Sequence, residues 1–163
     1  MPANGHSDPS RALLRHTIAV LSYRAGKAVR NAPDHFSEFR AAPDTRSAGE
    51  ILAHMCDLFD WALALAEGVH RWSDVPPKGW PVDCDRFFCA LEKFDGYLAS
   101  DAPLGRPVEQ LFQGPVADSL THTGQLTLMR RLAGSPIRAE NYARADIVAG
   151  RVGADQTAPR VEF

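Results

Sequence analysis

The sequence predicts an all-α protein whose main helices form a four-helix bundle with irregular connections. Four long segments place apolar residues at the three- and four-residue spacing of an amphipathic helix. Stretches rich in proline or glycine separate these segments, and such stretches end helices. No stretch of useful length alternates apolar and polar residues, so we expect no β-sheet.

The chain has 163 residues, which is enough for one domain with a substantial buried core. We expect this single domain over residues 10–163, with a short extension after the last bundle helix. Residues 1–9 are polar and rich in turn formers, and they are interpreted as a flexible N-terminal lead-in.

The first helix is expected from about Ser10, which can cap its start, to about Asn31, where "NAPD" ends it. In the connection that follows, "DHFSEF" is expected to form a helical turn. The second helix has the clearest start in the chain, because Ser47 and Glu50 form the capping-box pattern S-x-x-E. It is expected to run to about Trp72, before "SDVPPKGWP" breaks it.

A third helix is expected from about Cys84 to Ala99, where "SDAPLGRP" breaks the chain again. "VEQLFQ" is expected to be a short helical piece. The fourth helix is expected to begin at Pro115, because proline is favoured in a first turn, and to end at Gly134. The following stretch, "RAENYARADIVAGRVG", fits either a short helix or an ordered tail.

Composition excludes several classes of function. The formal net charge is −2 and no basic stripe is present, so no nucleic-acid partner is expected. No run of about 18 apolar residues occurs, so no membrane span is expected. The three cysteines, interpreted as small buried residues, lack a disulfide framework, which favours a reducing compartment and a cytoplasmic location.

Two groups of residues carry the chemistry that the sequence allows. Asp118 and His122 are four residues apart and therefore share one face of a helix. His54 lies on the apolar stripe of the second helix, either as a core histidine bonded to a carbonyl or carboxylate, or as a metal ligand. If these two helices are neighbours, the three side chains converge. Two imidazoles and a carboxylate suit zinc, nickel or ferrous iron and leave a position open.

Four further residues are candidate neighbours of this site. Asp57, one turn after His54, is expected to be exposed or to orient an imidazole, with direct metal ligation as the alternative. Gln125 and Tyr142 are candidates for hydrogen bonds to a ligand or substrate. Trp61 is expected to fill the core, and Trp61 and Tyr142 are candidates for the wall of the pocket.

Two short stretches resemble the DinB/YfiT family of small bacterial four-helix proteins. They are "EILAHM", which follows the capped helix start, and "THTGQLTLMRRLAG", some 65 residues later. The resemblance extends from about Ser10 to Gly134. It implies a metal site in which His54 is the helix-two histidine and His122 is the second member of an H-x-x-x-H pair. The first member of that pair is here Asp118, which adds a negative charge and a harder donor.

The resemblance also implies a homodimer and a metal-dependent enzyme that acts on a small molecule. One such enzyme is a transferase that uses a low-molecular-weight thiol as cosubstrate. A metal-dependent hydrolase, with water at the open position, is a first alternative. The second alternative is a non-catalytic dimeric bundle with a binding or stress-response role, whose histidines complete the core. Because Asp118 departs from the family pattern, neither the metal nor the reaction follows directly from the resemblance.

Overall fold

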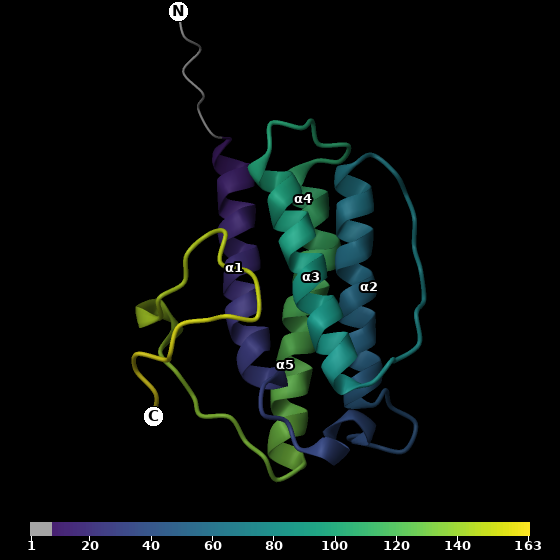
Figure 1. Ribbon diagram of the computed structural model, residues 1–163, viewed down its shortest axis with the longest axis vertical. Coiled ribbons are helices and arrows are strands. Elements are labelled where there is room, and N and C mark those ends of the chain that lie inside the picture. The colour runs from purple at the N-terminus through teal and green to yellow at the C-terminus, as the bar shows by residue number, and fades with distance from the viewer. Residues whose placement is uncertain (1–7) are drawn as a thin grey trace, which may run out of the picture.

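Four long helices form the bundle in the computed structural model, which describes residues 8–163 (Figure 1). They are α1 (Pro9–Val29), α2 (Ala48–Ala66), α3 (Trp80–Ala99) and α5 (Ala117–Leu132), and the short α4 (Val108–Leu111) leads into α5. The predicted all-α bundle is confirmed. Between residues 8 and 163 the only β pairing consists of two isolated bridges, Arg40 with Ser47 and Glu140 with Glu162.

The helices bury one continuous apolar core. α2 packs mainly against α3, α1 packs against α5 and α3, and α2 also contacts α5. Aromatic side chains fill the centre, and four phenylalanines are fully buried, at Phe36, Phe59, Phe87 and Phe94. Burying such residues is the main source of stability in a bundle of this size. None of the helices in the described part of the chain is long and apolar enough to cross a membrane.

The first helix begins at Pro9, one residue before the predicted start at Ser10. Asp8 is the N-cap, and its carboxylate accepts a hydrogen bond from the backbone N–H of Ser10 at 3.0 Å. Pro9 opens α1, so the predictions that residues 8 and 9 belong to a lead-in and that Ser10 caps the helix are wrong. The rest of the predicted lead-in, residues 1–7, lies outside the described residues.

The capping box of α2 is confirmed. The Ser47 hydroxyl accepts from the N–H of Glu50 at 3.2 Å, and the Glu50 carboxylate accepts from the N–H of Ser47 at 2.6 Å. The predicted end at Trp72 is wrong, because α2 stops at Ala66. Gly68 has a φ of 86°, and the N–H of Val69 reaches back to the carbonyl of Ala64 at 2.8 Å, which closes the helix.

The third bundle helix also starts earlier than the sequence predicts. α3 begins at Trp80 rather than Cys84, with a proline in its first turn. The indole N–H of Trp80 donates to the carbonyl of Val29 at 3.1 Å and so ties α3 to the end of α1. Of the cysteines, Cys56 is buried and Cys84 is half-buried, but Cys89 is exposed, contrary to its interpretation as a core residue.

The fourth bundle helix does not begin at Pro115. Helical structure runs without a break from Val108 to Leu132, and Phe112–Val116 form a π-helical turn between α4 and α5. In this turn the N–H of Ala117 bonds to the carbonyl of Phe112, five residues back. The reason is Pro115, which has no N–H to donate and whose ring needs the extra room.

The chain after α5 is an ordered tail, one of the two predicted alternatives. Residues 133–163 return along α1, and their only helical piece is the 3₁₀ turn Tyr142–Arg144 (Figure 1). The tail is fastened to α1 by polar contacts. Ser22, buried in α1, donates to the carbonyl of Val152 at 2.8 Å, and Val152 itself is buried.

Candidate metal centre

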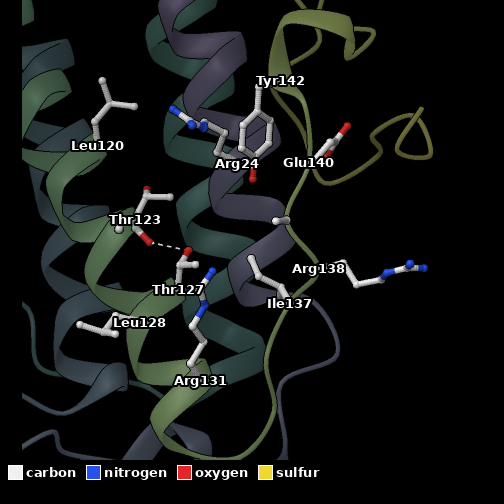
Figure 2. Close-up of a pocket in the computed structure, with 12 residues that line it drawn as sticks. Arg24, Leu120, Thr123, Thr127, Leu128, Arg131, Ile137, Arg138, Glu140 and Tyr142 are labelled. Atoms are coloured by element: carbon white, nitrogen blue, oxygen red, sulfur yellow. Dashed lines mark hydrogen bonds between the residues drawn. The ribbon is translucent and has the colours of Figure 1, made fainter. Parts of the chain in front are cut away.

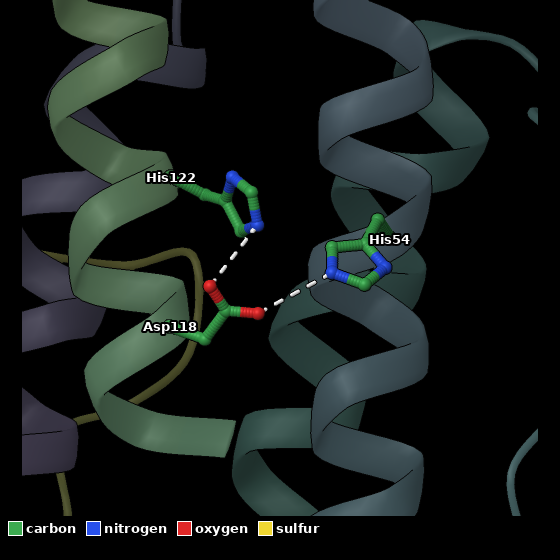
Figure 3. Close-up of side chains that lie close together, drawn as sticks. All are labelled: His54, Asp118 and His122. Carbon is green, nitrogen blue, oxygen red and sulfur yellow. Dashed lines mark hydrogen bonds and ion pairs between the residues drawn. The ribbon is translucent and has the colours of Figure 1, made fainter. Parts of the chain in front are cut away.

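The facing sides of α2 and α5 bring together the three residues that the sequence singled out. His54 projects from α2 toward Asp118 and His122 of α5 (Figure 3). Each residue offers one ligand atom, and these three atoms lie within 4.8 Å of one another. The i, i+4 spacing on α5 places the carboxylate and the second imidazole on one face, as the sequence predicts.

The Asp118 carboxylate lies between the two imidazoles. Nε2 of His54 is 3.4 Å from Oδ2, and Nε2 of His122 is 3.4 Å from Oδ1. Both distances exceed those of a good hydrogen bond between such groups. Two ligands bound tetrahedrally to one zinc-sized ion lie about 3.3 Å apart, which matches this separation. Each of these pairs therefore has the spacing of two metal ligands, while one ligand atom from each of the three residues lies within 4.8 Å of the others.

The histidines are more buried than the carboxylate. The side chains of His54 and His122 are 15% and 11% exposed, whereas that of Asp118 is 45% exposed. Burial lowers the pKa of His54, and the positive charge of Arg46 lowers it further, while Asp118 opposes both effects. His54 is therefore neutral near pH 7, which is the form that a metal ion requires.

Gln125 fixes the state of His122. Its Oε1 lies 2.8 Å from Nδ1 of His122, so Nδ1 carries the proton and donates it to the amide oxygen. In the neutral imidazole Nε2 then has a free lone pair, directed toward Asp118 (Figure 3). This is the arrangement in which proteins orient a metal-binding histidine, and it agrees with the predicted position of Gln125 beside a ligand.

An aromatic ring that the sequence did not place at the site, that of Trp72, lies beside His54. The Trp72 ring stands 5.6 Å from the His54 ring, centroid to centroid, and the Trp61 ring is 5.8 Å from that of Trp72. Trp72 escaped prediction because it was assigned to the end of α2, whereas it lies in the connection beyond Gly68. Nδ1 of His54 has no hydrogen-bond partner within residues 8–163.

Hollows flank the three side chains on both sides. One of about 420 Å³ is lined by Asp118, Trp61, Gln113 and Gly114, so the tryptophan forms a wall beside the carboxylate. Gln113 and Gly114 belong to the π-helical turn, which the sequence did not reveal. A second hollow of about 580 Å³ reaches His54 and is lined by charged residues that include Arg46.

Asp57 lines the hollow beside His54 but does not belong to the candidate ligand set. Its carboxylate is buried and accepts hydrogen bonds from Arg86 and from the N–H of Val75. The predictions that Asp57 is exposed, orients an imidazole or rivals the ligands are therefore wrong. Arg86 explains the difference, because it neutralises the carboxylate and allows its burial. Asp57 instead holds the connection between α2 and α3 against α2.

Tyr142 also lies elsewhere. Its ring packs against α1, edge-on to Tyr23 at 6.3 Å, and it lines a pocket on another side of α5. Tyr142 was a candidate for the wall because its place in the tail could not be fixed from the sequence. The tail turns toward α1 and so carries this residue away from His54.

No family model, curated protein or solved structure matches the chain. The resemblance to the DinB/YfiT family consequently stays a prediction that rests on two short stretches and on the arrangement of their residues.

Proposed function

We propose that the protein binds one divalent transition-metal ion through His54, Asp118 and His122 and acts as a metal-dependent enzyme of the DinB/YfiT type. The observation that carries this proposal is the pair of Nε2 atoms, each 3.4 Å from a different oxygen of one carboxylate. Two imidazoles and a carboxylate are a donor set for zinc, nickel or ferrous iron.

The protonation of His122 supports a cation at this place. In a neutral His122 imidazole whose Nδ1 donates to Gln125, Nε2 bears no proton and presents a lone pair to Asp118. A lone pair and a carboxylate oxygen repel each other unless positive charge lies between them. A metal ion supplies that charge and removes the repulsion.

The residues around the three ligands suit a reaction on a small molecule. A bound ion with three protein ligands would keep an open position, where it lowers the pKa of a thiol or of water. The Trp72 ring lies against the His54 imidazole, and the half-exposed side of Asp118 gives a substrate access. Gln125 keeps the His122 ring in the orientation that ligation needs.

The resemblance favours a thiol-dependent transferase over a hydrolase. The two are separated by turnover of an electrophilic substrate with and without a low-molecular-weight thiol. Turnover that requires the thiol supports the transferase, and turnover in water alone supports the hydrolase. By the same resemblance we propose a homodimer, for which light scattering should give about twice the chain mass of 17.8 kDa.

The metal is tested by elemental analysis. The purified protein is loaded in turn with zinc, nickel and ferrous iron, and then freed of loosely bound ions. We expect one ion per chain in the wild type and in Asp101→Ala, an exposed carboxylate just after the C-terminus of α3, and far less in Asp118→Ala. A wild type that retains none of the three ions would overturn the proposal. Equal retention of an ion by all three proteins would show that Asp118 is not a ligand and would overturn the three-residue site.

A further inference from the structure

A second pocket lies between α5 and the C-terminal tail, on a side of α5 that does not face His54 (Figure 2). Its volume is about 450 Å³. Leu120, Leu128 and Ile137 give it an apolar wall, while Arg24, Arg131 and Arg138 bring positive charge. The metal centre and this pocket share no lining residue.

The one carboxylate in the pocket is already neutralised. Glu140 is buried, and its two oxygens accept hydrogen bonds from the Tyr23 hydroxyl and from Lys27 Nζ, both at 2.8 Å. Neither Arg24 nor Arg131 has a carboxylate within ion-pair distance in the described part of the chain. The pocket therefore carries about two uncompensated positive charges, since Arg138 points away and lies 3.8 Å from Glu162 (Figure 2).

Arg24 is held ready for a ligand. Its guanidinium lies over the Tyr142 ring, 4.1 Å from the centroid, and the edge of the Tyr23 ring meets Tyr142 in turn. Stacking occupies the face of a guanidinium and leaves the N–H groups at its edge free to donate. Arg24 therefore keeps the donors that bind a carboxylate while losing little conformational freedom on binding.

Arg131 approaches the same space from α5. In Figure 2 its side chain runs along the helix and ends beside Thr127. The Thr127 hydroxyl donates to the carbonyl of Thr123 at 2.9 Å, so its oxygen remains available as an acceptor only. Leu128, next in the chain, is 54% exposed. Cationic hydrogen-bond donors therefore lie beside apolar surface that is exposed to solvent.

We propose that this pocket binds a small organic carboxylate with an apolar body. The carboxylate binds the free N–H groups of Arg24 beside Tyr142, Arg131 adds positive charge farther along the pocket, and the apolar body lies against Leu120, Leu128 and Ile137. The charge balance selects an anion, and the apolar wall selects against a bare inorganic ion. This inference does not rest on the metal centre, because it uses none of its residues.

The test uses three probes on the full chain, observed by NMR titration of backbone amides. Hexanoate carries both features, hexylammonium has a similar apolar body with the opposite charge, and inorganic phosphate has charge alone. We expect hexanoate to shift the amides of Gly124, Thr127 and Ala139 saturably. We expect hexylammonium to leave them unchanged and phosphate to bind at least about tenfold more weakly than hexanoate.

Two variants and a control assign the contacts. Arg24→Gln should raise the dissociation constant of hexanoate about tenfold or more, because it removes a charged hydrogen bond, and Arg131→Gln should raise it about threefold, because it removes a positive charge from the same pocket. Arg106→Gln removes an exposed arginine outside the pocket and should not change it. No saturable shift with hexanoate, equal binding of hexylammonium or phosphate, or unchanged affinity in Arg131→Gln would each overturn the proposal.

Discussion

Nδ1 of His122 and Oε1 of Gln125 lie 2.8 Å apart, one turn from each other on α5. This contact decides which nitrogen of the imidazole is free, and so it determines whether His122 can serve as a ligand. His54 lacks such a contact, since its Nδ1 has no partner in residues 8–163. The two histidines are thus held differently, and Gln125 is the residue to test first.

Replacing Gln125 with leucine should weaken metal binding by about 10- to 100-fold, because His122 would lose the acceptor that fixes its tautomer. The measurement is a competition titration of zinc against a chromophoric chelator. Gln110→Leu, at an exposed position of α4, is the matched control and should bind as the wild type does. Equal affinity in the two variants would show that Gln125 does not orient the ligand.

Replacing Asp118 with histidine should retain a metal ion but change the preference among metals. A carboxylate favours harder ions such as manganese, whereas imidazole favours zinc and nickel. We therefore expect the ratio of manganese affinity to zinc affinity to fall in Asp118→His. A ratio that stays constant would mean that the Asp118 carboxylate does not coordinate the ion.

Replacing Arg130 with methionine should lower the free energy of unfolding by about 2–4 kcal/mol. Arg130 is 4% exposed and donates to the carbonyls of Ala28, Arg30, Asn31 and Ser135. Methionine would leave these acceptors at the end of α1 without donors. Urea unfolding measures the loss, and Arg131→Met, at the exposed neighbouring position, should change stability by less than about 0.5 kcal/mol.

Replacing Gly105 with alanine should destabilise the fold by about 2 kcal/mol or more. A Cβ at Gly105 would overlap the backbone of Gly68, and the N–H of Gly105 bonds to the carbonyl of Ala66 at 2.7 Å. Gly96→Ala is the control, because a Cβ there meets nothing within 4 Å and alanine favours a helix. It should stabilise the protein by about 0.5–1 kcal/mol in the same denaturant assay.

Stability should fall as pH rises above about 10. Burial raises the pKa of Tyr23, and its hydrogen bond to Glu140 adds to the effect. The folded protein therefore keeps a proton that the unfolded chain releases near pH 10, so deprotonation favours unfolding. Urea unfolding at about pH 9 and about pH 10.8 measures the decline, which should be smaller in Tyr23→Phe.

The sequence predicted those features that depend on local spacing. The Ser47–Glu50 cap and the shared face of Asp118 and His122 follow from residues three or four positions apart. His54 reaches α5 only because α2 packs against α5. The position of His54 on the apolar stripe of α2 indicated that it faces the interior of the bundle. These are features that helical periodicity encodes directly.

Other features depend on contacts between distant residues, and the sequence could not reveal them. Asp57 is buried because Arg86, 29 positions later, neutralises it. Tyr142 lies away from the metal centre because Glu140 accepts hydrogen bonds from Tyr23 and Lys27. These bonds hold the tail against α1. The end of α2 was predicted too late for a local reason. Gly68 indicates the end of a helix, but the prediction followed the apolar periodicity instead.

The wide turn at Phe112–Val116 also bears on how this chain tolerates insertions and deletions. A π-helical turn holds one residue more than an α-helical turn, yet the helices on either side keep the directions in which their faces point. Loss of a single codon within the turn would therefore leave Asp118 and His122 opposite His54. What such a deletion would remove is the local bulge that carries Gln113 and Gly114 beside Asp118, so the shape of that hollow can diverge while the three ligands stay in place.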